Sequence, residues 1–184
     1  MGHSEAMGRT GSAKLTPALV AREVGLVPGT LVQRFGSKRG LLLALAEYTA
    51  RNAAALYERV QVQHATSPLE ALTALVVEAR GTLSTPETCA SHLAYLCSDL
   101  GDPEFRALAL TLQQTRERAT LSLLDHAVAA GELHAGTDTA ALAMTVQAAS
   151  GGTALLWAVD QQDTLADRQR TALDAVLAPH RATV

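Results

Sequence analysis

Two short helices joined by a glycine turn are predicted between Thr16 and Lys38, and this pattern limits the possible folds most. Thr16 can cap the first helix, with Pro17 at the first helical position, where a missing amide hydrogen costs nothing. Gly25 is a typical end signal. The apolar residues of this helix recur three or four positions apart, which places them on one face: Leu19, Val20 and Val24.

The second helix of the pair is predicted to begin at Pro28 and to end before Gly36. Leu31 and Phe35 lie four residues apart and share an inward face. Three polar residues are left for the opposite face: Thr30, Gln33 and Arg34. Two short helices with one shared apolar side and one polar side are typical of a helix-turn-helix DNA reader.

The run G-L-V-P-G-T-L-V-Q-R-F-G-S-K-R-G-L-L, residues 25–42, resembles the end of the DNA-binding domain in TetR-like transcriptional regulators. Later segments are similar to the regulatory domain of that family: a long helix running into Gly131-Glu132-Leu133, then Asp138 and a helix with a glycine pair. The resemblance implies an all-α fold with a small helix-turn-helix head, residues 1–45, and a larger helical-bundle regulatory domain, residues 46–184.

The same resemblance implies which residues contact double-stranded DNA. Gln33 is expected to read a base edge in the major groove, and Arg34 a guanine or a phosphate. Lys38 and Thr16 are expected to contact phosphates from the starts of their helices. The full predicted set is Thr16, Val27, Pro28, Thr30, Gln33, Arg34 and Lys38.

Two features depart from the family pattern. Val32 and Arg34 stand where the recognition helix usually carries Tyr and then His or Tyr, so one expected phosphate contact is missing. Residues 1–14 contain three glycines and no helical period, whereas the family has an amphipathic first helix before the position of Thr16. An alternative interpretation is therefore a diverged ligand-binding and dimerisation module of the same fold that no longer binds DNA.

Charge is distributed unevenly along the chain. Residues 1–40 hold six basic side chains against two acidic ones, which leaves nine basic and sixteen acidic residues in the remainder. A basic head on an acidic body suits a protein that approaches phosphates at one end. Six charges on small helices are equally consistent with an ordinary solvated surface.

Composition favours a helical protein without disulfides. The chain has 184 residues, 48% of them hydrophobic but only 3% aromatic, with six prolines. We expect a cytoplasmic protein, because no uninterrupted apolar run approaches the roughly 18 residues that a membrane span needs, and the first residues lack the apolar core of a signal peptide. The two cysteines, Cys89 and Cys97, are too far apart along one helix to form a disulfide.

Beyond Ser37, cap and stop signals predict six further helices. Their expected ranges are 37–60, 68–83, 86–100, 103–130, 138–160 and 164–177. The helix from Asp138 is apolar nearly all round and rich in small residues, so it is expected to be buried on more than one side. We expect a homodimer through the last two helices, although such residues could instead fill the core of a monomer.

A small-molecule site between the helices of the body is the most credible candidate for a ligand, and we expect a largely apolar effector. Polar-tipped or aromatic side chains within apolar helices are the candidates to line it: Ser91, His92, Tyr95, Gln113, Thr145 and Trp157. A core or surface role would explain each of these residues individually.

Catalysis is not expected. Cys89, His92 and Cys97 form the only cluster suggestive of a metal or a nucleophile, but on a helix Cys97 points away from the face that Cys89 and His92 share. No phosphate-binding loop or nucleophile motif is present in the sequence. We therefore expect neither an enzyme, nor a metal site, nor a cofactor.

Overall fold

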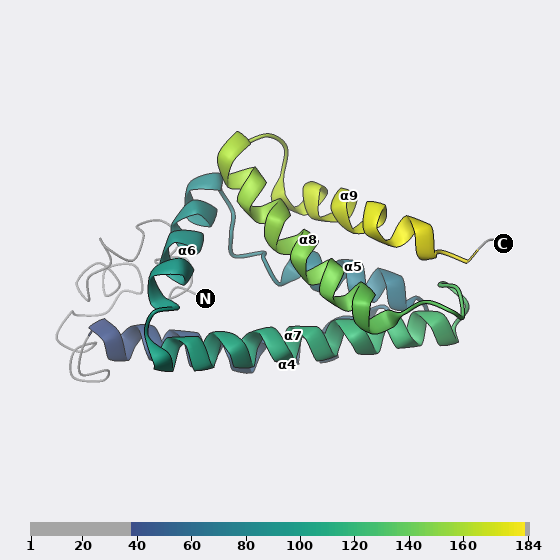
Figure 1. Cartoon of the computed structure of the whole chain (residues 1–184), viewed down its shortest axis with the longest axis horizontal. Helices are drawn as coiled ribbons and strands as arrows, with labels where there is room; N and C mark the ends of the chain where they lie inside the picture. Colours follow the sequence, from purple (N-terminus) through teal and green to yellow (C-terminus); the bar gives the residue numbers. More distant parts are fainter. Residues whose placement is uncertain (1–37, 183–184) are drawn as a thin grey trace. The chain divides into compact units, whose positions relative to one another are not determined.

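The structure, a computed structural model, describes residues 38–182, apart from several side chains between residues 38 and 50 and three between 95 and 99. Six α-helices make up almost all of this part (Figure 1). They are α4 (Lys38–Gln63), α5 (Pro68–Glu78), α6 (Pro86–Asp99), α7 (Pro103–Ala129), α8 (Thr139–Asp160) and α9 (Leu165–Leu177), followed by a 3-10 turn, η1 (Ala178–His180). Within the described residues the only β pairing is an isolated bridge between Leu133 and Arg181. The predicted all-α fold is confirmed.

Four of these helices begin at side-chain caps, which fixes their first residues. Ser67, Thr85, Asp138 and Thr164 each accept a hydrogen bond from a main-chain amide three residues later. Such a cap contributes about 1 kcal/mol to helix stability. All four starts agree with the sequence prediction to within a residue.

The end of α5 differs from the prediction. The helix ends at Glu78, five residues before the predicted Leu83. Arg80 N donates to Val77 O at 3.2 Å and Gly81 N to Glu78 O at 3.0 Å, so the chain tightens into turns here. A side chain at Gly81 would lie only 3.3 Å from the carbonyl oxygen of Glu78, which favours glycine at this turn.

The end of α7 follows the prediction closely. Gly131 adopts a left-handed conformation with φ of 75°, as a C-terminal glycine cap does. Its neighbour Glu132 donates its amide to Ala127 O at 2.9 Å. The chain can then leave the helix without stranding its last carbonyl groups.

By packing, the described chain divides into two compact units. The first contains residues 38–51 and Thr82–Leu112, hence α6 and one end each of α4 and α7. The second contains Asn52–Gly81 and residues 113–182, hence α5, α8, α9 and the remaining parts of α4 and α7. The predicted domain boundary at residue 45 stays a prediction.

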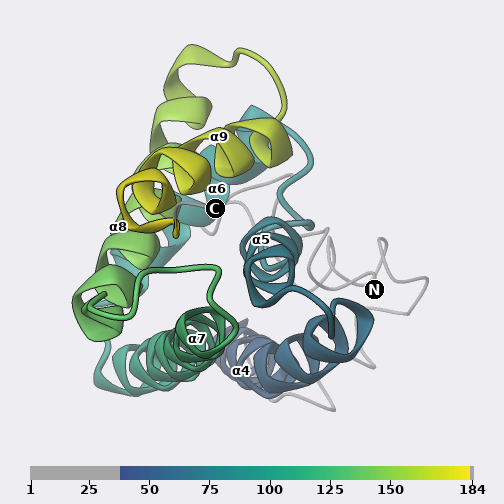
Figure 2. The same cartoon turned by 90° about the vertical axis from the view of Figure 1, so that its right-hand side faces the viewer.

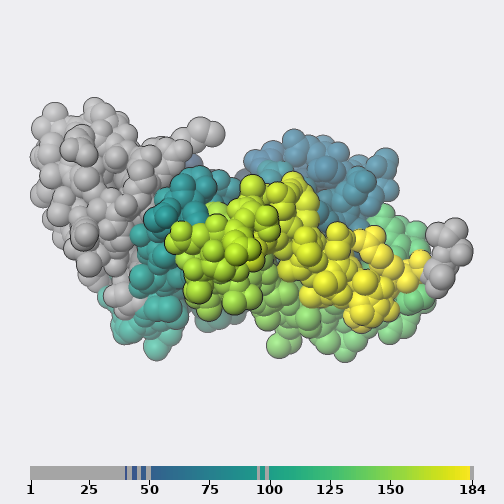
Figure 3. All heavy atoms as spheres, turned by 90° about the horizontal axis from the view of Figure 1, so that it is seen from above, coloured from purple at the N-terminus to yellow at the C-terminus, as the bar shows by residue number. Residues whose placement is uncertain are grey.

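The second unit holds a continuous apolar core. Figure 2 shows α5 end-on between α4 and α9, and α5 and α9 are in contact. Helices α8 and α9 also pack along each other and lie together at the surface in Figure 3. The largest side chains buried in this core come from five helices and from Leu133, which follows α7; they include Val60, Leu72, Leu123, Leu124, Leu133, Val146 and Leu177.

Candidate functional site

The predicted DNA contacts lie almost entirely outside the described residues. Thr16, Val27, Pro28, Thr30, Gln33 and Arg34 all precede residue 38. Helix α4 is described from Lys38 onward, so its predicted start at Ser37 stays a prediction. The seven residues stay a prediction.

Three of the predicted ligand-binding residues lie on α6 in the first unit. Ser91 and His92 are both half-buried. Tyr95 follows on the same helix, three residues after His92. Their role in binding stays a prediction.

The other three predicted ligand-binding residues lie in the second unit. Gln113 on α7 and Thr145 on α8 are exposed, and the Thr145 hydroxyl donates to Ala141 O of its own helix at 2.9 Å. Trp157 is buried at 4% exposure, and its indole N–H donates to Asp163 O at 3.2 Å. No described contact joins these three residues, and their role in binding also stays a prediction.

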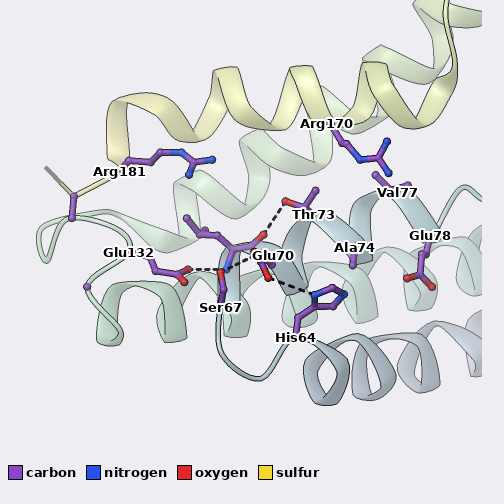
Figure 4. Close-up of a pocket in the computed structure, with 13 residues that line it drawn as sticks. His64, Ser67, Glu70, Thr73, Ala74, Val77, Glu78, Glu132, Arg170 and Arg181 are labelled. Atoms are coloured by element: carbon purple, nitrogen blue, oxygen red, sulfur yellow. Dashed lines mark hydrogen bonds and ion pairs between the residues drawn. The ribbon is translucent and has the colours of Figure 1, made fainter. Parts of the chain in front are cut away.

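The second unit has an open groove between α5 and α9, with a volume of about 930 Å³ (Figure 4). It was not predicted from the sequence. Arg170 and Arg181 reach it from the side of α9, whereas the opposite side carries mostly α5 residues, among them Glu70 and Glu78. None of the six predicted ligand residues lines it.

The charged groups of this groove are largely satisfied by the protein itself. The Glu132 carboxylate accepts from Leu69 N at 2.9 Å, and Arg59 pairs with Glu78. Arg170 pairs with Asp167 at 3.0 Å and Arg181 with Asp174 at 2.8 Å. Because its charged groups are already paired, this open groove has few free groups that could bind a ligand. We therefore interpret it as a surface groove left by the packing of the two helices.

A more unusual feature lies deeper in the second unit, where polar side chains interrupt the apolar core. We call this group the buried polar cluster, although only Thr120 and Gln169 are fully buried and the other four residues are half-buried: Arg80, Arg116, Thr120, Gln147, Ser150 and Gln169. Arg80 Nε donates to Ser150 Oγ at 3.1 Å, and Gln147 Nε2 donates to Thr120 Oγ1 at 3.1 Å. The cluster therefore links the end of α5 with α7, α8 and α9.

Two atoms of the buried polar cluster lack a hydrogen-bond partner. They are Nε of Arg116 and Oε1 of Gln169, both shielded from solvent. An unpaired buried polar atom costs about 1–3 kcal/mol. Such atoms are rare in folded proteins and mark places where a further group is missing or strain is tolerated.

The charge of Arg116 is disfavoured by its surroundings. Burial, and secondarily the positive charge of Arg80, lower the pKa of Arg116 from its ordinary value to about 10. A change of this size corresponds to about 3 kcal/mol against the charged form. Because the pKa stays well above 7, the guanidinium is still charged at neutral pH.

Helix α8 has a second apolar face that the described chain leaves uncovered. Its core face contains Leu142, Val146 and Trp157. Its other face exposes large apolar side chains at helical spacing: Met144 at 65%, Leu155 at 53%, Leu156 at 62% and Val159 at 73%. The glycine pair of α8 also opens onto free space, since a Cβ atom at Gly151 or Gly152 would meet nothing within 4 Å.

By length and composition alone, α8 is apolar enough to cross a membrane. The expectation that no run approaches that length is thus wrong for residues 139–160. One such helix is weak evidence for a membrane span, because core helices of other proteins meet the same criterion.

The possible metal cluster around His92 gains no support. Cys89 is buried and Cys97 is exposed, in line with their predicted separation around the helix. Among residues 38–182 no three His, Cys, Asp or Glu side chains are placed to hold a metal ion.

Comparison with solved structures gives long matches at low sequence identity. A protein from Saccharomonospora viridis in complex with choline, taken to be a transcriptional regulator, has a TM-score of 0.74 at 18% identity, covering 100% of this chain and 95% of that one. The TetR family transcriptional regulator PfmR from Thermus thermophilus has a TM-score of 0.70 at 18% identity, covering 96% and 95%.

The transcriptional regulator FadR from Bacillus subtilis, in complex with stearoyl-CoA, has a TM-score of 0.67 at 17% identity, covering 96% and 95%. No family model and no curated protein matches the sequence. Identities this low establish shared architecture only. The chain therefore has the fold of the TetR-family transcriptional regulators.

Proposed function

We propose that the protein is a DNA-binding transcriptional regulator, a ligand-responsive repressor that binds a palindromic operator as a homodimer. The observation that carries the proposal is the fold shared with the TetR-family regulator PfmR from Thermus over 96% of the chain. The helix-turn-helix pattern of residues 16–38 supplies the independent argument from sequence. Fold alone does not fix function, so both are needed.

The DNA-reading surface would be formed by the predicted set around Gln33 and Lys38. Gln33 offers an amide that can pair with an adenine edge in the major groove. Lys38 opens α4, where the positive end of the helix and its own ammonium group both favour a phosphate. Gln33 would thus carry sequence specificity and Lys38 affinity.

The exposed apolar face of α8 supports the homodimer. Large apolar side chains at 53–73% exposure are costly on a monomer surface, and an isologous contact with a second copy would cover them. The open glycine pair lets two helix backbones approach closely. Two heads held about 34–36 Å apart would then meet successive major grooves of the operator.

A small-molecule effector is supported by the neighbours, one of which holds choline and another stearoyl-CoA. These ligands differ in charge and size, so the fold does not dictate the effector. A ligand that binds better to a body shape with the two heads farther apart would release the DNA.

The proposal is tested by selecting binding sites from a random DNA pool at low salt with the full chain. We expect enrichment of a palindrome. Lys38→Ala should weaken binding uniformly across sequences, whereas Gln33→Ala should change the preferred bases. If a folded dimer enriches no sequence, the repressor proposal fails and the diverged, non-DNA-binding module replaces it.

A further inference from the structure

We propose that the buried polar cluster binds the oxyanion of a small organic molecule, such as a carboxylate or phosphate group, and that Arg116 receives it. The inference rests on the proposed function in one respect: the anion would be the effector of the regulator. The site itself follows from the second unit alone. It differs from the surface groove between α5 and α9, whose charges are already paired.

The first argument is the position of Arg116 on its helix. The core-facing stripe of α7 continues from it through Ala119, Thr120, Leu123, Leu124 and Ala127, all at 6% exposure or less. Arg116 therefore occupies the next position of a stripe that otherwise faces the core. An arginine is seldom buried unless something pairs with it.

The second argument is that the described protein supplies no such partner. Nε of Arg116 is buried without an acceptor, and no carboxylate of the described residues lies within ion-pair distance of its guanidinium. Other arginines of the described chain do have a carboxylate partner: Arg51, Arg59, Arg168, Arg170 and Arg181. Arg106 and Arg118 also lack a carboxylate partner among the described residues, but both are exposed to solvent, whereas Nε of Arg116 is shielded from it.

The third argument is that a second cation is held nearby. Arg80 donates to Ser150 Oγ at 3.1 Å, which fixes its guanidinium beside α8, and its charge acts on Arg116. Two positive groups at one place repel each other, and an oxyanion between them relieves that repulsion. The planar guanidinium fork matches the paired oxygens of carboxylates and phosphates.

Gln169 limits where the anion can lie. Its Nε2 donates a hydrogen bond to Ser150 O at 2.9 Å, and its Oε1 is the second atom of the cluster without a hydrogen-bond partner. A carbonyl oxygen repels an anion but accepts a hydrogen bond from a hydroxyl or an amide. The charged group therefore belongs beside Arg116, with a neutral donor of the same ligand suited to Gln169.

The test measures binding of defined probes to the full-length protein and two matched variants. Arg116→Met removes the proposed anion receptor, while Arg118→Met removes an exposed arginine of the same helix whose Nε donates only to Gln114 O of its own helix. The probes are acetate, octanoate and inorganic phosphate at constant ionic strength, with octanamide as the uncharged match for octanoate. Thermal unfolding and calorimetric titration report affinity, and the Nε–H resonance of Arg116 reports contact.

We expect at least one of the three anions to bind saturably, to raise the Tm and to shift the Arg116 Nε–H resonance. Octanamide should bind at least tenfold more weakly than octanoate. Arg118→Met should behave as wild type, and Arg116→Met should lose tenfold or more in anion affinity. Arg116→Lys, which keeps the charge but not the fork, should fall between the two.

Anion effects that are equal in wild type and Arg116→Met, or an Arg116 resonance that no anion shifts, would overturn the proposal in favour of a cluster that holds only water. Selected DNA provides a separate readout. An anion that binds through Arg116 to a protein without sequence-specific DNA binding would sustain the site and refute the regulator. Sequence-specific DNA binding without any anion response would sustain the regulator and refute the anion site.

Discussion

The side-chain amide of Gln169 donates a hydrogen bond to the main-chain carbonyl of Ser150, 2.9 Å away, and this contact ties α9 to the middle of α8. Gln169 is only 1% exposed, yet it occupies a stripe of α9 that is otherwise leucine: Leu165, Leu173 and Leu177. Each of these residues lies four positions from the next, which keeps them on one face. A single polar residue therefore sits inside the contact between the last two helices.

Gln169→Ala is expected to lower the free energy of unfolding by about 1–2 kcal/mol, because the lost hydrogen bond and the space left in the core outweigh the relief of the unpartnered Oε1. Urea unfolding followed by circular dichroism measures the change. Gln162→Ala provides the control, since Gln162 is exposed in the turn between the same two helices. A loss no larger than that of Gln162→Ala would show that the contact does not hold α9 in place.

Arg116→Met is expected to raise the stability of the ligand-free protein. The folded state carries the cost of a partly desolvated cation whose Nε is buried without an acceptor, and methionine fills similar space without a charge. We expect a gain of about 1–3 kcal/mol, or a Tm higher by several degrees. Differential scanning calorimetry at pH 7 should show the gain for Arg116→Met and a change of less than about 0.5 kcal/mol for the exposed Arg118→Met.

The size of this effect depends on pH in a defined way. The pKa of Arg116 is lowered to about 10 in the folded state, so the unfolded chain binds more protons from about pH 10 up to the higher pKa of an ordinary arginine. The destabilising contribution is therefore complete at every pH below about 10 and fades only above it. A stabilising effect of Arg116→Met that varied between pH 6 and 8 would contradict this account.

Acid should weaken the turn between α8 and α9 through Asp160. Hydrogen bonds from Arg168, at 2.8 and 2.7 Å, lower the pKa of this carboxyl below its ordinary 3.8. A lowered carboxyl pKa stabilises the fold above the unfolded-state pKa, and this contribution is lost as the pH falls below about 4. Asp160→Asn should thus reduce the loss of Tm between pH 5 and 3.

Asp163→Asn is the matched control for that pH profile. Asp163 lies in the same turn, with a left-handed φ of 59° that asparagine tolerates well. Its substitution should leave more of the acid-dependent loss in place than Asp160→Asn does. Equal profiles for the two variants would remove the Asp160–Arg168 pair as the cause.

Helix starts were predictable from sequence because their signals are local. Two adjacent residues are enough to indicate a cap and the first turn that follows it, as Ser67-Pro68 and Thr85-Pro86 do. The end of α5 was harder to predict from the sequence, because Leu83 continues the apolar spacing although the helix has already ended at Glu78. Leu83 is buried without being helical, and periodicity alone cannot separate these two cases.

The buried polar cluster was missed for a different reason. Its members lie up to 89 positions apart, from Arg80 to Gln169, and only tertiary packing brings them together. One signal was available: Arg116 falls in the apolar period of α7 that leads to Leu123. Thr145 also interrupts an apolar helix pattern, but its side chain is exposed in the described chain, so a polar residue in an apolar helix does not by itself indicate a buried site.

The exposed face of α8 yields the last prediction, which concerns assembly. Leu156→Glu is expected to abolish dimerisation at micromolar concentration, because a two-fold contact would bury the new carboxylate twice with no partner. Light scattering over a range of concentrations measures the mass. Val62→Glu is the control, since Val62 is 78% exposed at the end of α4 and lies outside the α8 face. A dimer that persists in Leu156→Glu would place the interface elsewhere, and the apolar residues from Met144 to Val159 would then need another partner.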